Sequence, residues 1–111
     1  MRALPTLALL GLSACATTGA RATVADGEAT FTWTGEADAV YLAGTPTSWR
    51  RVPLPREDGR FTLRLRVPPG RHEYRLEVES GGVVRAVLPP GSERVEDGFG
   101  GENAILRVGG S

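Results

Sequence analysis

The sequence predicts an all-β fold, a two-sheet sandwich of about seven antiparallel strands. Two observations support this prediction. Apolar residues recur at every second position in short runs, which is the pattern of strands with one buried face. The 15 Gly and 8 Pro separate these runs and interrupt any long amphipathic pattern, which argues against a helical bundle. We therefore expect a single small β domain in this chain of 111 residues.

The expected strands follow one another from about residue 29 to residue 108. Phe31 and Trp33 alternate with threonines in the first strand. Val40 and Leu42 mark the second, which a Gly-Thr-Pro break ends at residues 44–46. A short strand over 83–88 and a last strand over 103–108 close the domain.

Residues 60–67 and 71–79 show the clearest alternation, and the Pro-Pro-Gly sequence 68–70 between them predicts an antiparallel hairpin. The residues that we expect to be buried are Trp33, Phe61, Leu63, Leu65, Tyr74 and Leu76. Those that we expect to be exposed are Arg64, Glu73, Arg75 and Glu77, with ion pairs between the arginines of one strand and the glutamates of the other. His72 falls on the inward side, where we expect a buried, hydrogen-bonded ring.

Charge and composition exclude several functions. The chain has 13 basic and 13 acidic residues, so it lacks the basic surplus that a nucleic-acid partner requires. One cysteine and one histidine form neither an internal disulfide nor a four-ligand zinc site, and the acidic loop 97–102 matches no calcium template. No serine, histidine and acid cluster or paired carboxylate is visible, so we expect no enzyme, no cofactor and no metal.

Residues 1–14 have the features of an export signal. Arg2 precedes a short apolar stretch, which is too short to span a bilayer and ends at Leu12-Ser13-Ala14-Cys15. This tetrapeptide resembles the lipobox of bacterial lipoproteins, which implies cleavage before Cys15 and its acylation. Ordinary cleavage that leaves a free thiol is the alternative. The resemblance also implies, from Ala16, the outer membrane of a Gram-negative bacterium.

Residues 15–27 show no periodic apolar face, so we predict a lipidated cysteine followed by a flexible tether. The sandwich domain is then expected over residues 28–109. These boundaries describe a small exported domain on a lipid anchor.

The order of short motifs in this domain resembles glycogen-binding domains. Those domains occur in AMP-activated protein kinase β subunits and in isoamylase-type enzymes, as carbohydrate-binding module family forty-eight. The segments that carry the resemblance are Phe31-Thr32-Trp33, residues 39–44, Ser48-Trp49, Val52-Pro53-Leu54, Gly59-Arg60-Phe61, residues 69–75 and Asn103-Ala104-Ile105-Leu106. It implies an immunoglobulin-like early-set sandwich, in agreement with the strand pattern.

The resemblance also implies a site for an α-glucan. Its members hold the glucan on two tryptophans, a basic residue and a late loop that carries an aliphatic residue and an asparagine. The positions here are Trp49, Arg75, Phe99 and Asn103, and we predict that they cluster on one face. The second tryptophan is replaced by Gly81, Gly82 or Val83.

Each site residue also has a structural alternative. Trp49 could pack on Pro53 or Pro55, and Arg75 could pair with a neighbouring glutamate. Asn103 could hydrogen-bond the backbone of its loop, and Phe99 could fold back on the sandwich.

Two functions remain open at this point. The first is a non-catalytic, membrane-anchored lipoprotein that binds an α-glucan or related polysaccharide weakly. The alternative is a cell-envelope lipoprotein that has lost glycan binding and uses its sandwich to bind a protein.

Overall fold

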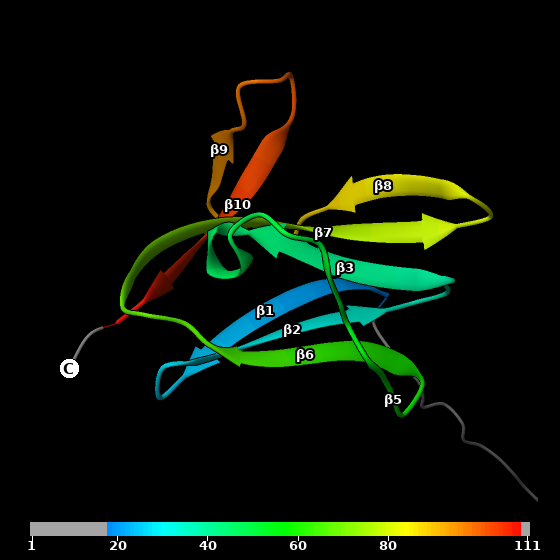
Figure 1. Cartoon of the computed structure of the whole chain (residues 1–111), viewed down its shortest axis with the longest axis horizontal. Helices are drawn as coiled ribbons and strands as arrows, with labels where there is room; N and C mark the ends of the chain where they lie inside the picture. The colour runs from blue at the N-terminus through cyan, green and yellow to red at the C-terminus, as the bar shows by residue number, and fades with distance from the viewer. Residues whose placement is uncertain (1–17, 110–111) are drawn as a thin grey trace, which may run out of the picture.

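The computed structural model describes residues 18–109, which fold into a sandwich of two antiparallel sheets (Figure 1). The prediction of an all-β sandwich is confirmed. In spatial order, the first sheet contains β1 (Gly19–Ala25), β2 (Glu28–Thr34), β6 (Arg60–Arg66) and β5 (Arg56–Glu57). The second contains β4 (Val52–Pro53), β3 (Ala39–Gly44), β7 (Gly70–Ser80), β10 (Glu102–Val108) and β9 (Arg94–Glu96), with β8 (Val83–Val87) also paired to β7.

The core lies between the two sheets and is built from the inward side of the alternating strands. Phe31 of β2 and Tyr74 of β7 meet edge to face across it, with ring centres 5.1 Å apart. Burial raises the pKa of the Tyr74 phenol to about 12. Of the residues expected inside, Trp33, Phe61, Tyr74 and Leu76 are buried, whereas Leu63 and Leu65 are half-buried.

The predicted hairpin between residues 60–67 and 71–79 is wrong. β6 pairs with β2 and β5, whereas β7 pairs with β3, β8 and β10 in the opposite sheet. Val67 is buried, and Pro68 and Pro69 have no amide hydrogen to continue a ladder, so the chain crosses from one sheet to the other here. Alternation identifies the inward face of a strand but does not determine which strand pairs with it.

The ion pairs expected between these two strands are therefore absent from residues 18–109. Arg64 lies 3.4 Å from Glu57 on its own sheet, and Arg66 donates to the Asp26 carbonyl at 2.8 Å. Glu77, which was expected to be exposed, is buried, and Glu73 and Arg75 are half-buried. The carboxylate of Glu77 is buried, and two arginines lie against it, Arg75 of the same strand and Arg51 from the loop before β4.

Residues 19–25 also differ from the sequence expectation, because they form β1 rather than a flexible tether. β1 pairs with β2 along its whole length, from Gly19 opposite Thr34 to Ala25 opposite Glu28. Ala20 is buried and Ala22 and Val24 are partly buried against the core. These side chains are small, so their alternation is weak in the sequence.

The expected signal peptide and Cys15 lie outside the described residues. Within residues 18–109, no helix is long and apolar enough to cross a membrane.

We predict that β1 is an integral part of the domain. A chain that begins at residue 28 should lose roughly 2 kcal/mol or more of unfolding free energy relative to one that begins at residue 18. The loss is expected because the shorter chain uncovers Ala29 and leaves the edge of β2 unpaired. Urea unfolding of both chains measures the difference, and equal midpoints would show that β1 contributes nothing to stability.

Candidate functional site

The site predicted from the sequence lies on the outer face of the β3–β7–β10 sheet, the side turned away from the core. Along β7, Tyr74, Leu76 and Val78 face the core, so Arg75 and Glu77 face outward. Across the sheet, Ala43 lies opposite Arg75, and Tyr41 lies opposite Glu77. Because side chains alternate along a strand, the polar side chains of β7 lie on one surface of the sheet.

Trp49 reaches this face from the loop after β3. A single 3-10 turn, Thr45–Thr47, ends at Ser48, and both Ser48 and Trp49 have left-handed backbones with φ of 56° and 63°. Such a conformation is unfavourable for a bulky side chain, by about 1–3 kcal/mol. A hydrogen bond from the Trp49 amide to the Gly44 carbonyl, 2.8 Å long, holds it. Trp49 remains 43% exposed, as a ligand-stacking residue requires.

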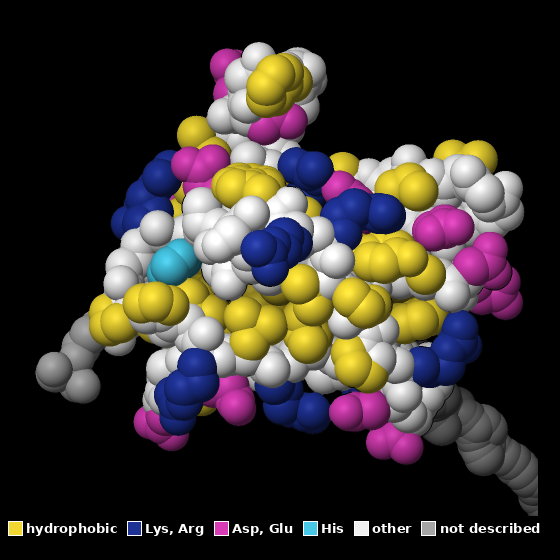
Figure 2. Space-filling model, viewed as in Figure 1, with side chains coloured by type: hydrophobic (Ala, Val, Ile, Leu, Met, Phe, Trp, Pro, Cys, Tyr) yellow, Lys and Arg dark blue, Asp and Glu magenta, His cyan; other side chains and the backbone are white. Residues whose placement is uncertain are grey.

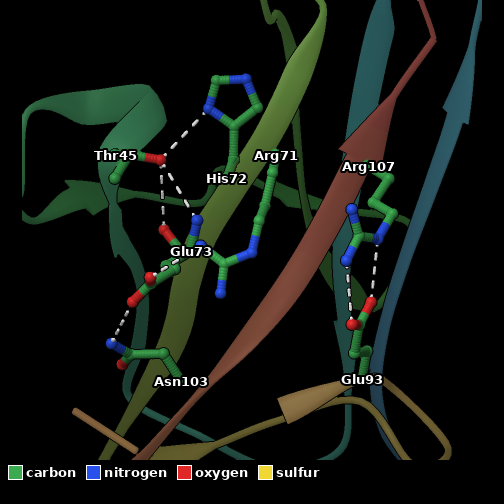
Figure 3. Close-up of polar contacts among 7 residues, drawn as sticks. All are labelled: Thr45, Arg71, His72, Glu73, Glu93, Asn103 and Arg107. Carbon is green, nitrogen blue, oxygen red and sulfur yellow. Dashed lines mark hydrogen bonds and ion pairs between the residues drawn. The ribbon is translucent and has the colours of Figure 1, made fainter. Parts of the chain in front are cut away.

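Close backbone packing fixes the start of this loop. A Cβ at Gly44 would lie 2.6 Å from the Cβ of Tyr74, so only glycine fits there. The Thr45 hydroxyl lies 3.1 Å from Nδ1 of His72 and accepts a 3.2 Å hydrogen bond from the Glu73 amide (Figure 3). His72 is half-buried rather than buried as expected. Its Nε2 lies 2.8 Å from the Pro68 carbonyl, so both ring nitrogens have partners and the expected hydrogen bonding is confirmed. These contacts tie the Trp49 loop to β7.

Arg75 lies beside Trp49, as predicted. Its guanidinium carbon is 5.6 Å from the centre of the indole ring. Its Nε donates to Glu77 at 2.9 Å, so the ion pair considered as an alternative is also present. The two contacts are compatible, because Glu77 holds the guanidinium in place next to the indole.

Glu77 joins Arg75 to a second arginine, Arg51. Arg51 donates to the other carboxylate oxygen of Glu77, and its guanidinium carbon lies 4.1 Å from the centre of the Tyr41 ring. Burial by itself would raise the pKa of Glu77. The hydrogen bonds and charges of Arg51 and Arg75 together outweigh that effect and lower the pKa below its usual value.

The sequence analysis missed Arg51, Glu77 and Tyr41 as members of this site. Arg51 and Glu77 are 26 positions apart. Their meeting depends on the pairing of β3 with both β4 and β7, for which the sequence contains no local signal.

Asn103 lies on the same sheet but is buried. Its side-chain nitrogen is 3.4 Å from the Glu73 carboxylate, which also pairs with Arg71 at 3.1 Å (Figure 3). Only 3% of Asn103 is exposed, and its side-chain oxygen has no partner among residues 18–109. In this conformation Asn103 does not reach a ligand on the surface, unlike the exposed rim position expected from the sequence.

Phe99 lies at the tip of the β9–β10 hairpin, which projects from the sandwich (Figure 1). Asp97 accepts hydrogen bonds from the Phe99 and Gly101 amides at 2.7 and 3.0 Å, which orders the turn. These bonds, helped by the charge of Arg75, lower the pKa of Asp97. Phe99 is 94% exposed and does not fold back on the sandwich; Figure 2 shows a hydrophobic side chain at this tip above acidic ones.

The position expected for a second tryptophan is a tight turn. Gly81 and Gly82 connect β7 to β8 with φ of 59° and 80°, the conformations of a two-residue hairpin loop that favours glycine. Val83 follows and is 68% exposed. The structure therefore brings together Trp49 and Arg75, leaves Asn103 buried against Glu73, and places Phe99 on a projecting hairpin.

Comparison with known proteins identifies several relatives. Residues 28–109 match a family model described as the glycogen recognition site of AMP-activated protein kinase. The chain is 38% identical over 78 residues to 5'-AMP-activated protein kinase subunit beta-1 of Rattus norvegicus, covering 70% of this chain and 27% of that protein. The same subunit of Sus scrofa is also 38% identical over 78 residues, covering 70% of this chain and 61% of that sequence.

A yeast relative extends the comparison. SNF1 protein kinase subunit beta-3 of Saccharomyces cerevisiae is 31% identical over 69 residues, covering 59% of this chain and 16% of that protein. The chain therefore spans less than two thirds of the length of the curated relatives that it matches.

We predict that Glu77 stabilises the domain in a pH-dependent way. Because folding lowers its pKa, its stabilisation is complete above the unfolded-state pKa and is lost as the pH falls through the folded-state pKa. Glu77→Gln should cost about 1–3 kcal/mol at pH 7, and the difference from wild type should shrink below about pH 4.

Urea unfolding at several pH values measures this difference. Glu79→Gln, on the same strand, is the matched control, since the Glu79 side chain has no ion pair in the described part of the chain. A Glu77→Gln deficit that is independent of pH would contradict the prediction.

Proposed function

We propose that this chain, which belongs to the family of the glycogen recognition site of AMP-activated protein kinase, binds an α-glucan or related polysaccharide without acting on it chemically. Family membership agrees with the resemblance seen in the sequence. The observation that supports binding is the exposed indole of Trp49, held in an unfavourable backbone conformation directly beside Arg75.

The chemistry of this pair fits a sugar. A flat indole covers the C–H face of a pyranose ring, and guanidinium N–H groups donate to the hydroxyls at the rim of that ring. Glu77 compensates part of the basic charge, so the site favours a neutral polyhydroxylated ligand over a strong anion. Without a second stacking tryptophan the affinity should be lower by about one to two decades.

Phe99 and Asn103 have different places in this proposal. Phe99 projects from the tip of the β9–β10 hairpin and is 94% exposed, so it is the aromatic side chain available as a second apolar contact with the sugar. Asn103 is buried and supports the face through its contact with Glu73.

A second candidate function rests on β8. This strand pairs with β7 on one side only, and Val83 and Val84 are 68% and 48% exposed. An open strand edge with exposed valines is a surface on which an extended protein segment can pair. The protein-interaction function, in the cell envelope, is therefore the alternative.

We also propose that the protein is exported and attached to the outer membrane of a Gram-negative bacterium through Cys15. Since β1 begins at Gly19, only three residues separate Cys15 from the sandwich. Four extended steps from Cys15 to Gly19 span at most about 14 Å. A lipid on Cys15 would hold the domain against the membrane surface rather than on a long tether.

The lipid anchor is tested by labelling. Cells that express the full chain should incorporate labelled fatty acid into it, and Cys15→Ser should abolish both the label and membrane fractionation. Ser13→Ala is the control, because it leaves the cysteine in place. A native chain that is soluble and unlabelled would contradict lipidation and support ordinary cleavage.

The glucan site is tested by gel retention. Trp49→Ala should remove most retention in a glycogen gel, since it deletes the stacking ring, which contributes roughly 1–3 kcal/mol. The unfolding midpoint should change little, because the indole is exposed. Val83→Ala, an exposed apolar residue on β8, should leave retention unchanged. A wild-type chain that no glucan retains would favour the protein-interaction function.

A further inference from the structure

We propose that Arg51 is a second sugar-binding residue, which extends the platform from Trp49 along the outer face of β3 and β7 to Tyr41. This inference rests on the proposed glucan-binding function and concerns the length of ligand that the face accepts. It derives from side chains that meet only in the folded sheet.

The sheet register places two adjacent rows of residues on this face. Arg75 lies opposite Ala43, and Glu77 lies opposite Tyr41. The rows are two residues apart along each strand, a separation of about 6.6 Å. Trp49 contacts the first row through Arg75, and Arg51 contacts both partners in the second. The contiguous surface is therefore longer than the Trp49–Arg75 pair alone.

The guanidinium of Arg51 is held in place yet accessible. Stacking on Tyr41 and the bond from Nε to Glu77 fix its plane, while the side chain stays 47% exposed. Ordering a free surface arginine on binding costs about 0.5–1.5 kcal/mol, and here the fold has already supplied that order. Within residues 18–109, the two terminal nitrogens of Arg51 make no hydrogen bond. They remain available as donors to sugar hydroxyls.

Glu77 makes this pair of arginines possible. Two guanidinium groups on one small face repel each other, and the carboxylate between them offsets this repulsion. Arg75 also uses only its Nε in this contact, so both arginines present their terminal nitrogens in the same way. The result is a row of donors with limited excess charge, which suits hydroxyl groups.

The arrangement requires that affinity depend on ligand length. A disaccharide occupies the Trp49–Arg75 end, whereas a longer glucan also reaches Arg51. Removing Arg51 should therefore weaken binding of long ligands and leave short ones unaffected.

The experiment is an NMR titration of the full chain with maltose and with maltoheptaose, which follows the indole N–H signal of Trp49. The signal of buried Trp33 serves as an internal reference. Wild type should bind maltoheptaose more tightly than maltose. Arg51→Gln should lower the maltoheptaose affinity roughly 3- to 10-fold and leave the maltose affinity unchanged.

Arg107→Gln is the matched control. Arg107 is also an exposed, ion-paired arginine of this sheet, bonded to Glu93 at 2.9 and 3.0 Å on the far part of β10 (Figure 3). It should alter neither affinity.

Three results would overturn the inference, and each has a distinct meaning. Equal maltoheptaose affinity in wild type and Arg51→Gln would remove Arg51 from the site and leave the proposed function intact. A parallel loss for both sugars would make Arg51 a support for Arg75 and not a contact. Failure of wild type to bind either sugar would refute the proposed function itself.

Discussion

Strand β7 connects the core to the candidate site, because its alternating side chains serve both. Tyr74, Leu76 and Val78 fill the space between the sheets, while Arg75 and Glu77 point to the outer face. A shift of one residue in its pairing with β3 would exchange these two sets. The burial of three large apolar side chains thus determines where the polar groups stand. The geometry of the site is a consequence of core packing.

The outer face adds its own constraint through the Glu77 carboxylate. Burying this group is unfavourable unless donors surround it, and Arg51 and Arg75 supply them. In return, the carboxylate orders two side chains that would otherwise be mobile. Trp49 is then held from both sides, by Arg75 along the face and by its own amide bond to Gly44. One buried acid therefore organises several exposed groups.

The sequence predicted well what depends on local pattern. The strands over residues 29–34, 39–44 and 103–108 and most of the buried set follow from alternation, and Trp49 and Arg75 follow from family motifs. The sheet assignment of β6 and β7 does not, because alternation leaves the neighbour of a strand undetermined. The sequence did not predict β1 as a strand, because its inward residues are small and their alternation is weak. The Arg51–Glu77 contact joins positions far apart in the chain, so only the folded sheet reveals it.

The Gly81-Gly82 turn, which departs from the family pattern, and Trp49, which matches it, differ in what explains them. The Gly81-Gly82 turn is accounted for by folding alone, since positive φ values favour glycine in a tight hairpin. Folding alone does not account for the exposed Trp49. Its left-handed backbone costs stability, and an exposed indole gains little stability from apolar burial. Folding therefore leaves Trp49 unexplained, which supports its proposed role in binding a glucan. With the turn unable to stack on a sugar, the polar and aromatic surface next to Trp49 continues through Arg75 and Glu77 to Arg51, so a bound glucan would run along β3 and β7.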